Sequence, residues 1–259
     1  MENTLLRKLR ERNIALGYSS AFPHPGLVEL TSRYWDFVWL CSQHGYHDYN
    51  SIYHCMLAAE KWDVATVVRV PGHEPDYLSR VMDLAPSAIM IPQVNNVEEA
   101  RAISKAVCFP PDGGRSYGGN RAISLYGWDY YKEKHTLIIA QIESEEAVKN
   151  AAEIINMPGI DMLFFSDNDM RLSMGVPFGA DERDIPNYVP HMQTVVKACL
   201  DCGKLAGLVA VSDFVLRTAI EAGFTAIVVA GDHLFLRMCQ SHAQEIREKI
   251  TTIFNEKGD

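Results

Sequence analysis

The chain has 259 residues, of which 47% are hydrophobic and 22% are charged. This ordinary globular composition leaves no room for a long disordered region and supports one sizeable core. The formal net charge of −9, with acidic and basic residues interspersed, excludes a nucleic-acid-binding surface and attraction to an anionic membrane, and it favours small molecules as partners.

The first residues and the cysteines bear on where the protein works. Residues 1–8 read as the start of an amphipathic helix and lack the apolar stretch of a signal peptide. No apolar run approaches the roughly 20 residues that a membrane span needs. The six cysteines are scattered, and a chain with an ample core needs no disulfide framework. We therefore expect a cytoplasmic protein with reduced thiols.

Short β-branched or apolar runs alternate with helical patterns along the whole chain. The expected strands are residues 14–20, 36–42, 65–70, 88–94, 136–143, 160–166, 205–210 and 225–230. The expected helices include residues 49–62, 75–84, 97–107, 145–155, 190–202 and 213–222. Such alternation requires parallel strands with right-handed crossovers, and the number of units favours closure into a barrel. The sequence thus predicts an α/β chain that forms a single (β/α)8 TIM-barrel domain over residues 1–259.

Two segments differ from this rhythm. Residues 110–134 contain several glycines and prolines, and so long an irregular segment is expected to form a loop near the active-site mouth. Residues 232–254 are amphipathic and become charged towards the end. We expect them to form an extended C-terminal helix that packs on a neighbouring subunit.

Polar residues gather where the predicted strands end, which is where this fold carries its chemistry. Gln141 and Glu143 stand two apart on one strand, so both point into the barrel mouth. A carboxylate there is costly unless it binds a cation, and Asp169 at the end of the adjacent strand offers a second oxygen donor. This pattern predicts a divalent metal held by Glu143 and Asp169. The alternative is that Glu143 forms an ion pair with Arg69.

Arg69 and His44 complete the set of candidate catalytic residues. Arg69 closes an otherwise apolar strand, and its planar guanidinium suits a carboxylate or a developing enolate. An anionic substrate needs such local positive charge, because the overall charge repels it. His44 lies on a glycine-containing loop, and histidine is the side chain whose ordinary pKa suits a general base that acts directly or through a metal-bound water.

Several stretches then follow one another in a specific order and spacing along nearly the whole chain. They are Leu16-Gly17-Tyr18, Pro23-His24-Pro25, residues 36–45, Val68-Arg69-Val70-Pro71, Met82-Asp83, Ile91-Pro92-Gln93-Val94, residues 109–118, Gln141-Ile142-Glu143 and residues 167–175. Together they resemble the HpcH/HpaI aldolase family, the metal-dependent pyruvate aldolases of the phosphoenolpyruvate/pyruvate barrel superfamily.

The resemblance implies a role for each candidate residue. Glu143 and Asp169 would bind a divalent metal, Mg²⁺ or Mn²⁺. Arg69 would steady the pyruvate enolate, and His44 would manage proton transfer through water. The metal would chelate the keto and carboxylate oxygens of a 2-oxo acid, which makes a methyl proton removable. The enolate then attacks an aldehyde, or forms when an aldol splits.

Other residues are implied to bind substrate or to support the site. Substrate binding is implied for Arg69 and Gln141. It is also implied for Ser166, Asp167 and Asn168, because backbone amides in the corresponding family loop help to hold the substrate carboxylate. Support is implied for Cys41, Gln43 and Asp83, with Asp83 beside Arg69.

The chain departs from the family pattern at two places. Cys41 stands where the family usually has an aspartate that pairs with the histidine, and a thiol cannot act as a charged acceptor unless it is ionised. Ser166-Asp167 stands where the family usually has Gly-Pro, so Asp167 adds a negative charge where an anion is expected. Asp167 could point away, bind the metal, or indicate changed chemistry.

These departures leave two other interpretations open. A branch of the family resembles citrate synthases of siderophore biosynthesis, in which the barrel condenses oxaloacetate with acetyl-coenzyme A without requiring a metal. There Glu143 would act as base on the acetyl group, and His44 and Arg69 would polarise the oxaloacetate carbonyl. The other interpretation is a degenerate barrel kept as a binding subunit. The intact metal carboxylates favour the aldolase.

Family members resemble trimers of dimers that exchange the terminal helix, so a homo-oligomer, from dimer to hexamer, is expected.

Overall fold

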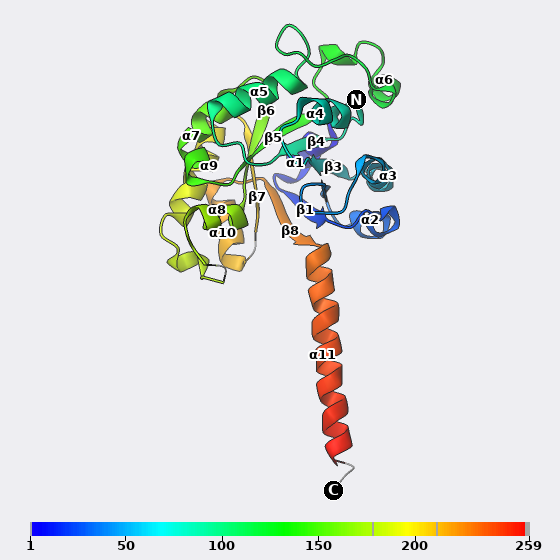
Figure 1. The fold of residues 1–259 in the computed structure, drawn as a ribbon, viewed down its shortest axis with the longest axis vertical. Helices are drawn as coiled ribbons and strands as arrows, with labels where there is room; N and C mark the ends of the chain where they lie inside the picture. The colour runs from blue at the N-terminus through cyan, green and yellow to red at the C-terminus, as the bar shows by residue number, and fades with distance from the viewer. Residues whose placement is uncertain (1, 178, 211, 257–259) are drawn as a thin grey trace.

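Eight parallel strands close into a barrel in chain order in the computed structural model of the protein (Figure 1). The structure describes residues 2–177, 179–210 and 212–256. The strands are β1 Ala15–Ser20, β2 Phe37–Cys41, β3 Ala65–Arg69, β4 Ala88–Ile91, β5 Leu137–Ile142, β6 Ile160–Phe165, β7 Leu205–Val209 and β8 Ala226–Gly231. Each strand pairs with the next, and β8 pairs with β1 to complete the closure. The predicted (β/α)8 barrel is confirmed.

Helices surround the barrel on its outside (Figure 1). They are α1 Thr4–Arg12, α2 Pro25–Ser32, α3 Tyr49–Glu60, α4 Pro75–Asp83, α5 Val97–Val107, α6 Asn120–Tyr126, α7 Glu145–Asn156, α8 Asp167–Ser173, α9 Tyr188–Asp201, α10 Asp213–Ala222 and α11 Asp232–Glu256, with 3₁₀ helices η1 Tyr130–Lys132 and η2 Glu182–Asp184. The sequence itself fixes several helix starts. Asn96, Ser144 and Ser212 each accept the amide proton of the residue three positions on, which satisfies one donor of the first turn.

The strand side chains alternate between two apolar cores. Phe37 and Trp39 of β2, Val67 of β3 and Phe164 of β6 belong to the core that fills the barrel interior. Val38, which lies between the first two in sequence, belongs to the larger core between the strands and the helices. Because side chains on a strand repeat every two residues, each inward row continues to the carboxyl end of its strand. The polar residues that continue these rows at the strand ends therefore also point into the barrel.

Two glycines on the inner face make room for the aromatic residues of the interior. A Cβ atom added to Gly17 of β1 would lie 2.2 Å from the ring of Phe37, and one added to Gly207 of β7 would lie 2.7 Å from the ring of Phe164. No side chain fits at either position without moving its neighbour. The interior of the barrel is therefore packed with aromatic rings, and the chemistry is confined to its rim.

The long irregular segment lies at the opposite end of the barrel from the expected one. It connects α5 to β5, so it returns the chain to the amino end of a strand. Arg115 of this segment contacts Asp83 at the end of α4, and Figure 1 shows α6 at the far end of the molecule from α11. The segment lines a cavity of about 520 Å³ there. The prediction that it borders the active-site mouth was wrong, because a connection from a helix to the next strand lies at the amino end of the barrel, opposite that mouth.

The last helix projects from the barrel, as expected from the sequence. α11 runs through 25 residues from Asp232, and Figure 1 shows most of its length away from the rest of the molecule. Its exposed apolar side chains are Leu234, Phe235, Leu236, Met238, Ile246, Ile250, Ile253 and Phe254. Within the described part of the chain, no helix is both long enough and apolar enough to cross a membrane.

Candidate active site

Three polar side chains continue the inward rows at the carboxyl end of the barrel. Arg69 is the last residue of β3, Gln141 lies near the end of β5, and Glu143 directly follows that strand. All three are buried, with 8%, 0% and 3% of their surface exposed. The sequence placed all three at strand ends on one side, and the structure brings them to the same end of the barrel.

The Glu143 carboxylate is held by one backbone donor and leaves one oxygen without a partner. Its Oε2 accepts a hydrogen bond of 2.8 Å from the amide of Gln93. Gln93 has a φ of 53°, in the left-handed region that non-glycine residues rarely adopt. In the described structure Oε1 of Glu143 and both amide atoms of Gln141 are buried without a hydrogen-bond partner. Buried polar atoms without partners are rare in folded proteins, so these atoms are candidates for binding a ligand.

The charge state of Glu143 reflects its surroundings. Burial raises its pKa above the ordinary value, and the negative charge of Asp169 raises it further. The Gln93 amide, the Ser166 hydroxyl and the charge of Arg69 lower the pKa but do not cancel the rise. The raised pKa reflects the energetic cost of a negative charge on this buried carboxylate, and a cation bound beside it would offset that cost.

Asp169, predicted to be the second metal-binding carboxylate, lies on the element next to Glu143. It lies in the first turn of α8, which follows β6, and β6 pairs with β5 beside Glu143. Neither Glu143 nor Asp169 forms an ion pair with a lysine, arginine or histidine of the described residues. Over the same residues, no group of three or more His, Cys, Asp or Glu side chains could hold a metal. Two carboxylates with the remaining positions left to water and substrate fit a hard ion such as Mg²⁺.

Arg69 is buried without a carboxylate partner among the described residues. Its guanidinium stacks on the ring of Trp39, 4.6 Å from the ring centroid, and its Nη2 donates to Sγ of Cys41 at 3.0 Å. Its Nε is buried and has no acceptor. The alternative in which Glu143 and Arg69 form an ion pair is therefore not what the structure shows, and Arg69 keeps donor capacity for a ligand.

Cys41 and His44 lie on β2 and in the loop that follows it. Sγ of Cys41 accepts the Arg69 hydrogen bond and a weaker one of 3.4 Å from the His44 amide. Burial raises the pKa of the Cys41 thiol, but the Arg69 charge and these hydrogen bonds outweigh burial, so the pKa lies below its usual value. The His44 ring is exposed, and Oε1 of Gln43 beside it is buried without a partner.

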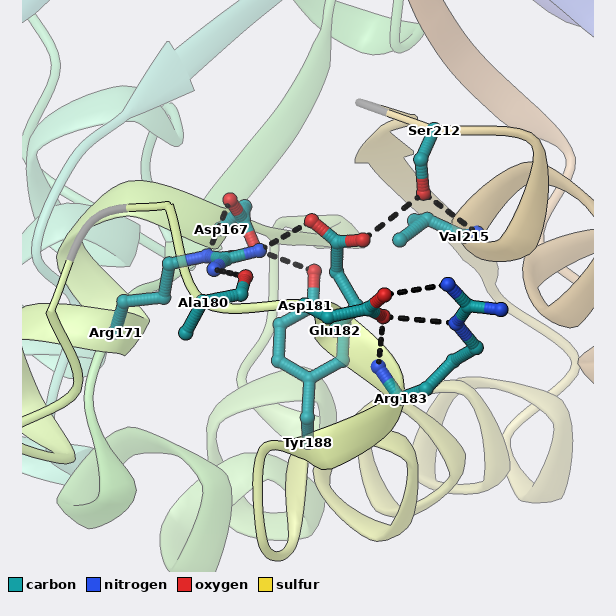
Figure 2. A network of polar contacts seen from close by, with 9 residues as sticks. All are labelled: Asp167, Arg171, Ala180, Asp181, Glu182, Arg183, Tyr188, Ser212 and Val215. Atoms are coloured by element: carbon teal, nitrogen blue, oxygen red, sulfur yellow. Dashed lines mark hydrogen bonds and ion pairs between the residues drawn. The ribbon is translucent and has the colours of Figure 1, made fainter.

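Asp167 points away from the site, which was one of the alternatives left open. Its carboxylate accepts two hydrogen bonds from Nε of Arg171, at 3.0 and 2.9 Å, and one from the hydroxyl of Tyr188. Figure 2 shows Arg171 between this carboxylate and that of Glu182, which binds Nη2 at 2.6 Å and accepts from Ser212. The structure therefore does not bring the Asp167 side chain to a substrate-binding position.

The alternation along β6 accounts for that direction. Phe165 packs in the outer core and contacts the ring of Tyr188 edge-on, with the ring centroids 5.7 Å apart. Ser166, one residue further, continues the inward row, and Asp167 begins α8 with its carboxylate directed to Arg171 and Tyr188. Asn168 is exposed on the first turn of α8. Ser166 is therefore the buried residue of the predicted substrate-binding loop that continues an inward row.

Asp83 has a different partner from the expected one. Its carboxylate accepts a hydrogen bond of 2.7 Å from Nη2 of Arg115, in the loop at the amino end of the barrel. It lies at the last position of α4, and helices of this fold run back from the carboxyl to the amino end of the strands. Asp83 thus makes no hydrogen bond or ion pair with Arg69 in the described chain, and the expected support of Arg69 by Asp83 is not seen.

Asp232, which sequence reasoning missed, lies at the same end of the barrel. Its buried carboxylate accepts from the amides of Ala21 and Phe22, at 2.7 and 2.9 Å, and from the hydroxyl of Tyr18. It joins the loop after β1 to the first residue of α11. An aspartate directly after an apolar strand is the signal that could have identified it, by the same rule that identified Glu143.

The chain is similar to known proteins both in sequence and in fold. A family model described as HpcH/HpaI aldolase/citrate lyase matches residues 36–233. The chain is 34% identical over 187 residues to a 4-hydroxy-2-oxovalerate aldolase of Novosphingobium aromaticivorans, which covers 70% of this chain and 71% of that relative. A crystal structure of an HpcH/HpaI aldolase/citrate lyase family protein from Burkholderia cenocepacia matches with a TM-score of 0.83 at 26% identity, over 95% of this chain and 99% of that one. The citrate synthase SbnG shares the fold, with a TM-score of 0.82 at 22% identity over 96% of this chain and 98% of that one.

The raised pKa of Glu143 predicts a pH-dependent effect on stability. A carboxyl whose pKa is higher in the folded than in the unfolded state favours folding at low pH, and this stability is lost as the pH rises through the folded pKa. The substitution Glu143→Gln in metal-free protein should therefore raise stability, and with it Tm, at neutral pH. Thermal unfolding in the presence of a chelator measures this.

The gain from Glu143→Gln should disappear below the ordinary carboxyl pKa of 4.5, where both states are protonated. Glu153→Gln, on the exposed face of α7, is the matched control and should leave Tm unchanged at both pH values. A loss of stability at neutral pH, or a gain that does not depend on pH, would contradict the assigned environment of Glu143.

The Arg171 network gives a second prediction. Arg171→Ala leaves Asp167 buried without its cation, and it should lower the free energy of unfolding by about 3–5 kcal/mol. Arg183→Ala is the control, because Arg183 forms its ion pair with Asp181 on the surface and should change stability by no more than about 0.5 kcal/mol. Urea unfolding of both variants measures the difference. Equal losses in the two variants would show that the network adds nothing to the fold.

Proposed function

The chain belongs to the HpcH/HpaI aldolase/citrate lyase family, and from that premise we propose that it is a metal-dependent aldolase that makes or splits a bond between a pyruvate enolate and an aldehyde. One observation carries the proposal. Oε1 of Glu143 and Nε of Arg69 are buried at one end of the barrel, and neither has a hydrogen-bond partner in the described chain. A 2-oxo acid bound with a cation would supply a partner of the right charge to each.

The donor set fits a divalent cation, Mg²⁺ or Mn²⁺, held by Glu143 and Asp169. When bound, such an ion draws electron density from the carbonyl of a 2-oxo acid and so lowers the barrier to removal of an adjacent proton. The partnerless Oε1 of Glu143 is the structural support for this assignment, and the raised pKa of that carboxyl agrees with it. Gln141, buried beside them with two free amide atoms, is assigned to orient the substrate.

Arg69 and His44 are assigned to substrate binding and to proton transfer. Arg69 holds the substrate with its free guanidinium N–H groups, and its fixed positive charge stabilises the oxyanion of the enolate. His44, on an exposed loop, exchanges protons with solvent and removes the hydroxyl proton when an aldol splits. The O–H electrons form the aldehyde carbonyl, the C–C bond breaks, and its electron pair passes to the enolate. The enolate then takes up a proton at carbon to give the 2-oxo acid.

Proton exchange at the methyl group of pyruvate tests this function. The protein is incubated with pyruvate and Mg²⁺ or Mn²⁺ in deuterium oxide, and loss of the methyl signal is followed by NMR. Glu143→Gln and Asp169→Asn should each slow exchange by about two orders of magnitude or more, because the activating ion is lost. Calorimetric titration with Mn²⁺ should show weaker binding in the same variants, and Glu153→Gln should match the wild type in both measurements.

Two outcomes would contradict the aldolase. Exchange that persists in chelator, together with release of free thiol from acetyl-coenzyme A and oxaloacetate, would establish the citrate-forming alternative. The structure of SbnG shows a related fold but leaves that choice to the assay. A folded protein that is inactive in both assays would establish a binding subunit.

Subunit assembly is also part of the proposal. We infer that the chain forms a homo-oligomer, between a dimer and a hexamer, in which α11 packs against another copy. The exposed apolar side chains along α11 support this, because a monomer gains nothing from a helix that carries them into water.

Removing the residues after Leu234 should therefore yield monomers or insoluble protein, as measured by light scattering after size-exclusion chromatography. Ile246→Ser with Ile250→Ser keeps the helix length and should also weaken assembly, because two apolar contacts are lost. Thr251→Ser with Thr252→Ser is the matched control on the same turns. A soluble truncated protein with an unchanged oligomer would exclude a role for α11 in assembly.

A further inference from the structure

Arg69 presents a problem of charge. Its side chain is buried at the end of β3, and within the described residues no carboxylate forms an ion pair with it. Its two protein contacts are both with β2, namely the ring of Trp39 and Sγ of Cys41 at 3.0 Å. A buried guanidinium with no counter-ion is strongly destabilising, and a ring face offsets only part of that cost. Glu143 lies close enough for its charge to interact with Arg69, but it forms no ion pair with the guanidinium, so a negative charge in direct contact would stabilise Arg69 in the substrate-free protein.

Cys41 is the residue in a position to supply this charge. Its sulfur accepts hydrogen bonds from Nη2 of Arg69 and from the amide of His44, and both are groups that stabilise a thiolate more than a thiol. The loop after β2 adds the amide of Gly45. On the other side of β2, strand β1 Ala15–Ser20 carries no acidic or basic side chain. Arg69 is therefore the charge that acts on the Cys41 sulfur.

The other buried cysteines show that this environment is specific. Cys55 and Cys199 are also buried, and burial raises the pKa of each thiol to about 12. Neither is hydrogen-bonded to an arginine. Cys41 is as deeply buried, yet its pKa lies below the ordinary thiol value because Arg69 and the loop amides outweigh burial.

We propose that Cys41 is ionised in the substrate-free protein and serves as the counter-ion that positions Arg69. Cys41 is thus a positioning residue, and it acts on Arg69 rather than on His44, whose ring is exposed. The thiolate and the Trp39 ring together fix the guanidinium, so that its remaining N–H groups face the substrate. The last step rests on the proposed function, whereas the ionisation of Cys41 does not.

Ultraviolet absorbance of thiolates as a function of pH tests the ionisation without any substrate. The wild type and Cys55→Ser should both show a thiolate that forms below the ordinary thiol range, and Cys41→Ser should lack it. Arg69→Met should move the same transition to higher pH. Identical titration curves for the wild type and Cys41→Ser would overturn the proposal.

Enzyme kinetics test the positioning role. Cys41→Ser keeps a small acceptor but loses the charge, so the KM for the 2-oxo acid should rise by about ten- to a hundredfold, with a smaller change in kcat. Cys41→Asp restores a negative charge and should recover KM, while the acidic limb of the kcat/KM profile moves to lower pH. An unchanged KM in Cys41→Ser would overturn the positioning role. If no variant turns over substrate but the thiolate titrates as expected, the proposed function fails and the counter-ion stands.

Discussion

The site depends on one constraint, the alternation of side chains along strands that close into a barrel. The inward rows are apolar and aromatic through most of their length, and they end in Arg69, Gln141 and Glu143. Each of them keeps at least one buried polar atom that has no hydrogen-bond partner in the described structure. Such atoms destabilise a fold, so they are the candidates for binding a ligand at this end of the barrel.

The chain also carries an additional acidic residue close to the proposed substrate site. Asp167 begins α8, and its carboxylate is directed away from that site, where Arg171 neutralises it and Tyr188 donates a hydrogen bond (Figure 2). Arg171 also binds Glu182, in the loop that leads to α9, and Ser212 extends the network to the start of α10. The network thus ties the first turn of α8, which carries Asp169, to the loop before α9 and to the start of α10. A glycine-proline turn is rigid through its backbone, whereas this turn is held by side chains.

The barrel and the ends of its strands could be predicted from the sequence because both follow from local periodicity. The inward direction of Gln141 and Glu143 came from their spacing of two, and the structure places both as expected. The direction of Asp167 was left open by the sequence, because its partner Arg171, which also binds Glu182, could not be assigned without tertiary structure. Asp83 and residues 110–134 lie in or beside connections from a helix to the next strand, which are at the amino end of the barrel; residue composition alone does not indicate this, but the order of helices and strands does. The Arg69–Cys41 contact joins two strands and has no local signature.

Asp232 connects the projecting helix α11 to the loops at the carboxyl end of the barrel. It begins α11, and its carboxylate holds the amides of Ala21 and Phe22 in the loop after β1. The carbonyl of Ala21 in turn accepts the amide of Tyr46, in the loop that carries His44. One carboxylate and a short series of backbone hydrogen bonds therefore link the first residue of the projecting helix to the histidine loop. A neighbouring subunit packed on α11 would thus be only a few hydrogen bonds away from the backbone around His44.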